Sequence, residues 1–310
     1  MKPKVYIDGK EGTTGLQIYD RLALRQDIDL LLIDEDKRKD TEERKKLMNA
    51  ADVVFLCLPD AAAIEAVTLV ENPNTRIIDA STAHRTNHAW DYGFPELSKA
   101  HREAIEKSRR VANPGCHATG FISIVYPLVA MGILPKDALL SCFSLTGYSG
   151  GGKKMIAQYE AADREELLST PALYALTQGH KHLPEMQKIC GLTTVPVFTP
   201  IVDDYYKGMA TTVPLHLSQL NGVESLHQLW KALRDHYAGQ KLVHVAPENP
   251  EGKLYGGQKS GENDLTIVVA GNDSQLTITA LFDNLGKGAS GAAVQNMNLM
   301  LGFEETAGLL

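Results

Sequence analysis

One segment of the sequence combines a candidate nucleophile with a turn that would expose it. Asn113-Pro114-Gly115 leads directly into Cys116, and an apolar stretch of helical character runs from Phe121 to Met131. Pro and Gly shape a tight turn, so the thiol is expected just before a helix, where the helix dipole favours the thiolate. Backbone N–H groups there can also stabilise an oxyanion. The pattern predicts covalent catalysis by Cys116, and the alternative is a buried, inert cysteine.

A thiolate nucleophile needs an acid/base partner, and two histidines two residues apart are candidates. His180 and His182 share one face of an extended segment, so both can reach one pocket. A metal-binding pair is the competing interpretation, but no third ligand motif accompanies it, and we predict no metal. Surface histidines are the other alternative. We favour His182 as the acid/base and His180 as a substrate contact, while His117 is adjacent to Cys116 and is expected to point elsewhere.

A glycine motif near the N-terminus indicates a dinucleotide site. Gly9, Gly12 and Gly15, with Thr13 and Thr14 between the last two, follow a β-prone run and open a helix-like stretch. Glycine permits a tight turn and close approach to a pyrophosphate, which the N–H groups and dipole of the helix then bind. A plain strand-to-helix turn is the alternative interpretation.

The type of nicotinamide cofactor stays open at this level. A second apolar run ends at Asp34, about 20 residues on, where a ribose contact is expected. A carboxylate there favours a ribose 2′-hydroxyl and hence NAD. Lys37 and Arg38 follow at once and can hold the 2′-phosphate of NADP. A solvated charged turn is the alternative for the two cations.

Two further segments carry groups that suit an anionic substrate. Arg85 ends the run Asp79-Ala80-Ser81-Thr82-Ala83-His84, which follows a predicted strand and therefore lies where ligands bind in parallel sheets. Its guanidinium can clamp a phosphate or carboxylate in bidentate fashion. Gly147 to Lys154 is a second glycine-rich loop with two cations, which suits either the cofactor or the substrate anion. A surface arginine and a flexible hairpin are the alternatives.

The elements that must position these groups change character along the chain. In the first part, apolar strands alternate with helices, which favours a parallel sheet covered on both faces. After Gly115 the strands lengthen and alternate in polarity, which suits a mixed or antiparallel sheet. The expected strands cover 4–7, 30–33, 53–58, 76–79, 139–145, 195–202, 209–217, 265–270 and 275–281, with helices at about 14–25, 61–70, 121–131 and 288–301.

Composition sets limits on the class of protein. The chain has 310 residues, 44% of them hydrophobic, which suits two domains or one large one. A net charge of −7 provides no positive field for nucleic acid or an anionic membrane, and no run of about 18 apolar residues predicts a membrane span. Cys57, Cys142 and Cys190 are far apart and form no CxxC pair, which fits a reducing cytoplasm.

Together these motifs resemble those of the N-acetyl-gamma-glutamyl-phosphate reductase family in its short form, over essentially the whole chain. The motifs that carry the resemblance are Gly9–Gly15, 80–85, 113–116, 180–185, Lys207-Gly208-Met209, 283–291 and Gln295-Asn296-Met297-Asn298. The long form of the family has an arginine in the loop that here runs Ser149 to Lys153. The family belongs with the aspartate-semialdehyde and glyceraldehyde-phosphate dehydrogenases.

The resemblance implies an α/β fold in two parts. A Rossmann-like NADP-binding domain is expected at residues 1–115, completed by about 286–310 because the C-terminal helix returns to it. Residues 116–285 are expected to form an α+β catalytic, substrate and oligomerisation domain with a mixed or antiparallel sheet. A homo-oligomer, dimer or tetramer, in the cytoplasm is the expected assembly, with no nucleic acid or membrane partner.

The resemblance also implies a reaction and a set of residues. Cys116 would form a thioester during NADP-dependent reductive dephosphorylation of N-acetyl-glutamyl phosphate to N-acetyl-glutamate semialdehyde in arginine biosynthesis. The small-molecule ligand is thus an acyl phosphate or an aldehyde. Besides Cys116, His180 and His182, substrate contacts are expected at Arg85, Ser81, Asn113, Glu185 and Lys153, and cofactor contacts at Gly9, Gly12, Thr13, Thr14, Gly15, Asp34, Lys37, Arg38, Pro59, Ser149, Gly150 and Asn284.

Other functions share parts of this pattern. An aspartate-semialdehyde or related acyl-phosphate dehydrogenase has the same chemistry but needs a pocket for a free amino group. Cys116 with His182 also suits a thioester or amide hydrolase that uses no nicotinamide. A dinucleotide-sensing module without catalysis is the third alternative.

Overall fold

The structure is a computed structural model that describes residues 1–10 and 12–309, so Glu11 of the glycine motif lies outside the described residues. The chain divides into two compact units. Unit 1 consists of Met1–Pro114 with Ala289–Leu310, and unit 2 consists of Gly115–Gly288. Among the described residues, no helix has the length and apolar character needed to cross a membrane.

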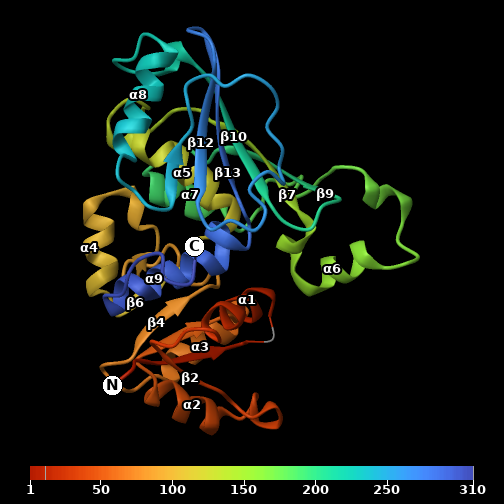
Figure 1. Ribbon diagram of the computed structural model, residues 1–310. Coiled ribbons are helices and arrows are strands. Elements are labelled where there is room, and N and C mark those ends of the chain that lie inside the picture. The colour runs from red at the N-terminus through yellow and green to blue at the C-terminus, as the bar shows by residue number, and fades with distance from the viewer. Residues whose placement is uncertain (11, 310) are drawn as a thin grey trace. The chain divides into compact units, whose positions relative to one another are not determined.

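Unit 1 is built on a six-stranded sheet in which every pairing is parallel, in the order β2-β1-β3-β4-β6-β5 (Figure 1). Its central strand Val53–Leu56 is buried on both faces, as continuous apolar runs in such sheets are. The prediction of a Rossmann-like parallel sheet is confirmed. The strands are β1 (Lys4–Asp8), β2 (Asp29–Leu31), β3 (Val53–Leu56), β4 (Arg76–Asp79), β5 (Asp91–Tyr92) and β6 (Arg110–Ala112).

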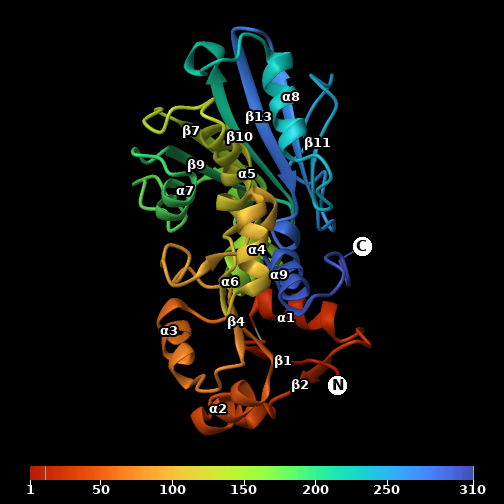
Figure 2. The ribbon, with the colours of Figure 1, turned by 90° about the vertical axis from the view of Figure 1, so that its left-hand side faces the viewer.

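The C-terminal helix α9 (Gly291–Leu301) belongs to unit 1, which confirms the predicted return of the chain. It lies beside α4 and also contacts α1 and β4 (Figures 1 and 2). Small residues on α9 permit this close packing, and Asn296 donates from Nδ2 to the carbonyl of Gly93 at 2.9 Å. The other helices are α1 (Thr13–Leu22), α2 (Thr41–Ala50), α3 (Asp60–Leu69) and α4 (Lys99–Lys107), with 3₁₀ turns η1 (Glu35–Lys37) and η2 (Pro95–Leu97).

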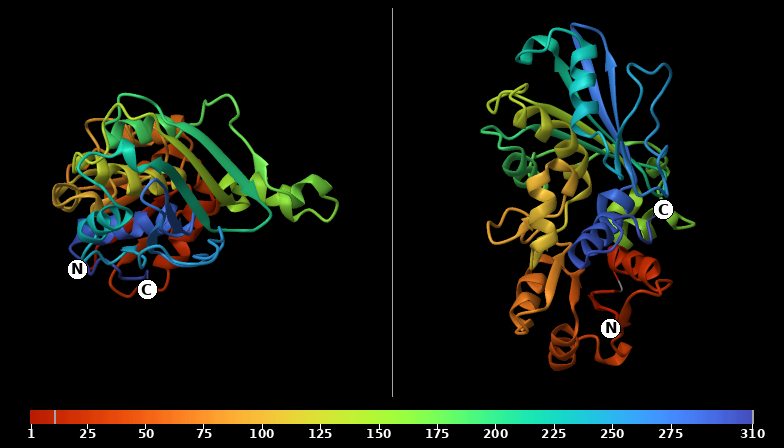
Figure 3. Two further views of the ribbon diagram at one scale, coloured as in Figure 1. Left: turned by 90° about the horizontal axis from the view of Figure 1, so that it is seen from above. Right: turned by 60° about the vertical axis from the view of Figure 1, so that its left-hand side comes forward.

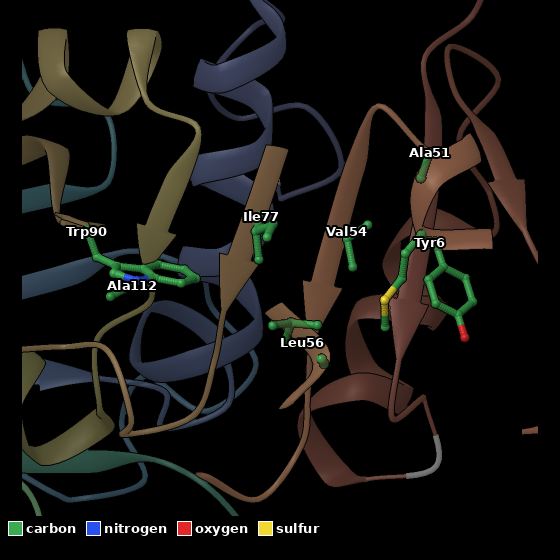
Figure 4. Packing of buried hydrophobic residues seen from close by; sticks show 9 residues of the cluster. Tyr6, Ala51, Val54, Leu56, Ile77, Trp90 and Ala112 are labelled. Carbon is green, nitrogen blue, oxygen red and sulfur yellow. The ribbon is translucent and has the colours of Figure 1, made fainter. Parts of the chain in front are cut away.

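One buried cluster ties together four of the parallel strands (Figure 4). Alternate residues of β1, β3, β4 and β6 point into it, and the α2 side chain Met48 and Trp90 complete it. Because these strands are parallel, their carboxyl ends meet at one edge of the sheet. The cluster thereby fixes the positions of the loops that follow, which carry the predicted ligand contacts of unit 1. Its buried members are Tyr6, Met48, Ala51, Val54, Leu56, Ala66, Ile77, Trp90 and Ala112.

Unit 2 contains a seven-stranded sheet in the order β11-β12-β13-β10-β7-β9-β8. Two pairings, β11 with β12 and β7 with β9, are parallel and the rest are antiparallel. The predicted mixed sheet is confirmed. Its strands are β7 (Ser141–Gly147), β8 (Ala172–Leu173), β9 (Val197–Asp203), β10 (Met209–His216), β11 (Val243–Val245), β12 (Leu265–Gly271) and β13 (Gln275–Phe282).

Helix α5 (Cys116–Ala130) packs against β10 and β13 of this sheet (Figure 2). The prediction that the helix begins at Phe121 is wrong: it begins at Cys116 itself. The first turn carries small and polar residues, so it lacks the apolar periodicity that marks the remainder. Those small residues allow close packing, because a Cβ on Gly120 would lie 2.4 Å from Oγ1 of Thr211 on β10.

The remaining elements of unit 2 surround the sheet. They are α6 (Gly152–Glu160), α7 (Leu183–Cys190) and α8 (Leu226–His236), the 3₁₀ turns η3 (Tyr148–Gly151), η4 (Glu166–Ser169) and η5 (Leu217–Gln219), and the π-helical turn η6 (Gly286–Ser290) that precedes α9. Figure 3 shows the α6 segment projecting beyond the end of β7 and β9. A tight ion pair between Arg164 and Asp204 closes that segment onto the end of β9, with a nitrogen–oxygen distance of 2.6 Å.

Candidate active site

Cys116 is the first residue of α5, and its position suits a nucleophile. Gly115 is the helix N-cap, and no side chain of the described residues caps this end. Backbone N–H groups in the first turn of a helix can bind an anion, and the positive end of the helix dipole favours a thiolate. Cys116 is half-buried, whereas burial raises the pKa of the Cys142 and Cys190 thiols.

Two neighbours fix where the thiol lies. Glu185, on α7, is buried and its Oε1 accepts a hydrogen bond of 2.9 Å from the backbone N–H of Gly115. A buried carboxylate on this N–H holds the residue just before the nucleophile. On the other side, a Cβ on Gly288 would approach the Cys116 Cβ to 3.1 Å. The glycine in the segment after β13 therefore lets the chain pass close to the thiol.

Three histidines form a compact group in unit 2. The ring centroids of His180 and His182 are 4.7 Å apart, and that of His117 lies 5.5 Å and 5.7 Å from them. His182 is buried and is the N-cap residue of α7, while His117 is the second residue of α5. The structure thus brings together both predicted histidines with the residue next to Cys116.

The surroundings keep two of these rings uncharged near neutral pH. Burial, with a smaller effect from His180 and Lys181, lowers the pKa of His117 to about 3. Burial and the charge of Lys181 lower the pKa of His180 to about 4. The backbone N–H of His182 donates to Nδ1 of His180 at 3.2 Å, so neutral His180 carries its proton on Nε2. His180 therefore has a defined hydrogen-bond donor, its Nε2–H.

A buried polar chain behind the histidines is not predicted from the sequence. His117 Nε2 lies 2.6 Å from the hydroxyl of Tyr174, and its Nδ1 lies 2.8 Å from Oγ of Ser144. Ser144 in turn lies 2.7 Å from Oγ1 of Thr211. His117, which was expected to point elsewhere than Cys116, packs its ring against His180 and so belongs to the histidine cluster. A signal was present: a histidine just before a strongly apolar helical stretch is expected to be buried and then needs hydrogen-bond partners.

The predicted cofactor contacts of unit 2 lie together at the end of β7. Asn284 donates from Nδ2 to Oγ of Ser149 at 2.9 Å and accepts at Oδ1 from the N–H of Gly208 at 2.8 Å. A Cβ on Gly150 would lie 3.7 Å from the same Asn284 amide. Lys153, on α6, is exposed.

In unit 1, the glycine turn has the shape of a phosphate cradle. Gly9 has a φ of +83°, and a Cβ there would lie 2.4 Å from the carbonyl oxygen of Cys57. Gly12 N–H bonds to the Gly9 carbonyl at 3.0 Å, and a Cβ on Gly15 would strike that same carbonyl at 2.5 Å. Gly12 is the N-cap of α1, in which Thr13 and Thr14 are the first residues, and no side chain of the described residues caps it. Backbone N–H groups at this end can therefore bind a pyrophosphate.

The charged residues after β2 lie differently from the prediction. The strand ends at Leu31 rather than near Asp34, because the acidic and basic residues that follow form a 3₁₀ turn with Asp34 as its N-cap. Lys37 Nζ pairs with the Asp34 carboxylate at 3.0 Å, and Arg38 lies 3.7 Å from Glu35. All four side chains are exposed. Pro59, the other predicted contact in this unit, is the N-cap of α3.

The loop after β4 holds the predicted anion-binding arginine firmly. Arg85 is buried and donates from Nε to the carbonyl of Asn113 at 2.9 Å and from Nη2 to that of Ala80 at 3.0 Å. Asn113 itself donates from Nδ2 to the carbonyl of Ala289 at 3.0 Å. The structure therefore joins two predicted substrate contacts, Arg85 and Asn113, through the backbone.

The same loop is anchored at its start by Asp79. Ser81 donates to this carboxylate from both its backbone N–H, at 2.9 Å, and its hydroxyl, at 2.7 Å. His84 lies with Nδ1 2.6 Å from Asp79 and stacks on Trp90 with ring centroids 4.1 Å apart. Ser81 thus has a holding role in the loop that the sequence does not reveal.

Neither unit offers an arrangement of metal ligands among its described residues, since no three His, Cys, Asp or Glu side chains gather to hold an ion. The chemistry of the candidate site in unit 2 accordingly rests on a thiol, imidazoles and backbone donors. These are the parts that acyl transfer to sulfur requires.

Family models describe both parts of the chain. Residues 17–108 match the NAD binding domain of semialdehyde dehydrogenases. Residues 116–284 match the semialdehyde dehydrogenase dimerisation domain. Together the two matches span most of the chain and agree with an oxidoreductase that uses a nicotinamide cofactor.

Curated relatives and solved structures resemble the chain over nearly its full length. An N-acetyl-gamma-glutamyl-phosphate reductase from Brucella anthropi is 49% identical over 309 residues, covering 97% of this chain and 99% of the relative. N-acetyl-gamma-glutamyl-phosphate reductase 2 of Nostoc sp. is 46% identical over 320 residues, covering 99% of each. The crystal structure of aspartate semialdehyde dehydrogenase II from Vibrio cholerae, complexed with ASA, shares the fold with a TM-score of 0.73 at 15% identity, covering 97% of this chain and 98% of that one.

Proposed function

Because this chain belongs to the N-acetyl-gamma-glutamyl-phosphate reductase family, we propose that it reduces N-acetyl-glutamyl phosphate to N-acetyl-glutamate semialdehyde in arginine biosynthesis. The observation that carries the proposal is the place of Cys116 at the start of α5, directly before His117, whose ring packs with those of His180 and His182. A thiol there meets both needs of the reaction, because thiolate is a strong nucleophile and a good leaving group.

The first half of the reaction transfers the acyl group to sulfur. The Cys116 thiolate attacks the acyl-phosphate carbon, and a carbon–sulfur bond forms while charge develops on the carbonyl oxygen. The N–H groups of the first turn of α5 stabilise that oxyanion. The carbon–oxygen bond to phosphate then breaks, and phosphate leaves with the electron pair. Glu185 supports the step by holding the N-cap N–H of Gly115 in place.

The second half releases the aldehyde. A bound nicotinamide cofactor supplies a hydride to the thioester carbon. The resulting thiohemiacetal oxygen exchanges a proton with a histidine as the carbon–sulfur bond breaks, and the thiolate of Cys116 is regenerated. We assign this proton to His182, which is buried at the N-terminus of α7, and a substrate contact to His180, whose Nε2–H is available as a donor.

Unit 1 supplies the groups that fit a dinucleotide. A Cβ on Gly9 or Gly15 would clash with backbone atoms, so both positions require glycine, and the N–H groups at the start of α1 suit a pyrophosphate. We propose NADP rather than NAD, because exposed Lys37 and Arg38 can bind a 2′-phosphate while Lys37 neutralises Asp34. Pro59, Ser149, Gly150 and Asn284 are the further cofactor contacts that we propose.

The substrate anion is assigned to the cations and amides of the predicted set. Arg85, held by two backbone carbonyls, keeps its fork in one orientation and suits a phosphate. Asn113, Ser81 and Lys153 complete the proposed contacts. Residues 1–115 with about 286–310 form the proposed NADP-binding domain, and 116–285 the catalytic domain.

The proposed assembly is a homo-oligomer, a dimer or tetramer, in the cytoplasm. Apolar side chains are exposed on three adjacent strands of unit 2, Phe143 on β7, Val197 on β9 and Leu173 on β8. Such a surface suits a second copy of the chain. Cys57, Cys142 and Cys190 form no disulfide in the described part of the chain, in keeping with the reducing compartment that we propose. Sedimentation velocity tests the assembly, and a monomer at micromolar concentration would contradict it.

The activity is tested by following NADPH formation from N-acetyl-glutamate semialdehyde, phosphate and NADP. Turnover by the wild type and none by Cys116→Ser is the expected result, with Cys142→Ser as the matched control that retains activity. Aspartate semialdehyde, run in parallel, should be used at least about 10²-fold less well, because a pocket shaped for one polar group rejects its analogue strongly. Equal use of both aldehydes, or activity in Cys116→Ser, would refute the proposal.

Two further variants test the assigned roles. His182→Asn should lower kcat by about 10²–10⁴-fold, the range for a general acid or base, whereas His180→Asn should act mainly on KM for the aldehyde. Arg38→Ala should raise KM for NADP and leave KM for NAD unchanged. A main effect of His182→Asn on KM and of His180→Asn on kcat would contradict the histidine roles, and an effect of Arg38→Ala on KM for NAD alone would contradict the cofactor assignment.

A further inference from the structure

A chain of four polar groups runs from the sheet of unit 2 to the histidine cluster, and the proposed reaction assigns it no role. It begins at Thr211 on β10, passes through Ser144 on β7 and His117 on α5, and ends at the hydroxyl of Tyr174. Thr211 and Ser144 are register partners in the antiparallel pair of β10 and β7. All its members but Tyr174 are buried, so the half-buried phenol is the end that faces outward.

The surroundings of His117 define its charge. His117 is neutral because burial lowers its pKa to about 3, so it carries a single N–H. We take that proton to lie on Nε2, so that the imidazole donates to the Tyr174 oxygen and Nδ1 accepts from Ser144. The Tyr174 O–H then remains available to a further acceptor, and the bond from His117 polarises it. Burial raises the pKa of Tyr174, so its hydroxyl stays protonated at neutral pH.

The segment that carries Tyr174 is held under backbone strain. Ala175 and Gln178 have φ values of +52° and +58°, although neither is glycine. Gln178 is fixed to β9 by two hydrogen bonds with the backbone of Phe198, at 2.8 Å and 2.9 Å, and the N–H of Tyr174 bonds to the Pro200 carbonyl at 3.2 Å. Strained residues held by several contacts cluster where a side chain must be presented to a ligand.

Tyr174 lies beside the histidine cluster. Its ring centroid lies 6.0 Å from that of His180 and 6.2 Å from that of His117, the residue that follows Cys116. The negative charge of Cys116 adds to the effect of burial on the pKa of Tyr174, so the two groups interact electrostatically. A polarised donor close to Cys116 suits an oxygen that becomes negative on the acyl carbon bonded to that sulfur.

We propose that Tyr174 is a catalytic residue whose hydroxyl donates a hydrogen bond to the acyl oxygen of the substrate on Cys116, and that His117 is the positioning residue that orients it. The inference rests on the proposed function, because it assigns Tyr174 to the oxyanion of that reaction. No proton leaves Tyr174. The hydrogen bond strengthens as charge develops on the oxygen and weakens again when the carbonyl re-forms.

The test uses two amides that divide the functions of the imidazole. Gln at position 117 places an amide near the site of Nε2 and can still reach Tyr174, whereas Asn reaches only toward Ser144. Steady-state kinetics with N-acetyl-glutamate semialdehyde, phosphate and NADP are compared for Tyr174→Phe, His117→Gln, His117→Asn and the double variant His117→Asn/Tyr174→Phe. Both amides bury one polar group, so the His117 pair is matched for folding, which thermal denaturation monitors.

The expected result is a coupled loss. Tyr174→Phe should lower kcat by about 10²-fold, the cost of one oxyanion donor, with little change in KM. His117→Asn should match it, His117→Gln should retain most of kcat, and the double variant should be no slower than Tyr174→Phe alone. Additive losses, equal effects of the two amides, or an unchanged kcat in Tyr174→Phe would overturn the role of this pair while wild-type activity upholds the reaction. A wild type inactive on this substrate would refute both.

Discussion

Burial of an uncharged His117 should make unit 2 sensitive to mild acid. In the unfolded chain a histidine has a pKa near 6.5, whereas burial lowers the pKa of His117 to about 3 in the folded unit. The unfolded state therefore binds more protons between these values, and stability rises with pH across this window. The contribution of neutral His117 to the stability of unit 2 is fully present above pH 6.5. It decreases as the pH falls from 6.5 to 3, and it does not change further below pH 3.

The size of the effect follows from linkage. Between pH 7.5 and pH 5.0 the two pKa values give a loss of about 2 kcal/mol in the free energy of unfolding from His117 alone. His180 acts in the same direction, because its pKa is lowered to about 4. A loss of this size is a large part of the stability of an ordinary domain, which is about 5–15 kcal/mol.

Urea denaturation can isolate the contribution of His117. The chain has two tryptophans, and Trp90→Phe leaves Trp230, whose Nε1 donates to the Ala246 carbonyl at 2.8 Å within unit 2. In that background, His117→Gln removes the titrating ring and keeps an amide in its place. Between the two pH values, the free energy of unfolding should fall by about 2 kcal/mol more in the protein that keeps His117 than in the His117→Gln variant. Parallel pH dependences would show that His117 does not remain neutral and buried, and would refute the reasoning.

Three other outcomes are expected. Glu185→Ala should destabilise unit 2 by about 1–3 kcal/mol, because it leaves a buried N-cap N–H without its carboxylate, whereas Glu185→Gln keeps an oxygen there. Chemical denaturation compares the two variants, and equal losses of unfolding free energy would contradict this role of Glu185. Ala175→Gly should stabilise unit 2 by up to about 1 kcal/mol, because glycine adopts the left-handed backbone conformation without strain, while Ala172→Gly, on β8, should destabilise it. Thermal melts that rank the two variants in the opposite order would exclude backbone strain at Ala175. Gly120→Ala should cost about 1–3 kcal/mol by overpacking and lower kcat by displacing α5, with Gly179→Ala as the unaffected control.

The fold could be predicted because its signals are local. Continuous apolar strands such as Val53–Leu56 indicate burial on both faces, and alternating strands such as β10 and β13 indicate one covered face. The ends of the helices and strands were harder to predict from the sequence. Helix α5 begins five residues before its apolar periodicity does, and β2 ends three residues before Asp34, because charged and small residues obscure both ends.

In the candidate site, too, the residues with a local sequence signal could be predicted and those defined by long-range contacts could not. Cys116, His180 and His182 stand out because a thiol after a Pro-Gly turn and two alternating histidines each have a mechanism attached to their spacing. The carboxylate of Glu185 is named by the resemblance alone, and its contact with Gly115 joins residues 70 apart in the chain. No local pattern specifies such a bond, because it depends on where α7 packs against α5.

His117 illustrates the general reason. Its neighbour in sequence, Cys116, is half-buried at the start of α5, while the ring of His117 meets residues 27 and 57 positions away. Those partners are placed by the pairing of β7 with β10 and by the strained segment that follows β8, so the polar chain exists only once the sheet has its register. A single-residue shift of β7 would turn Ser144 to the other face and leave a buried imidazole without a partner, which is costly. The register of the sheet and the orientation of Tyr174 are therefore set by the same contacts, and changes to the core of unit 2 should alter catalysis through this residue before they disturb the thiol.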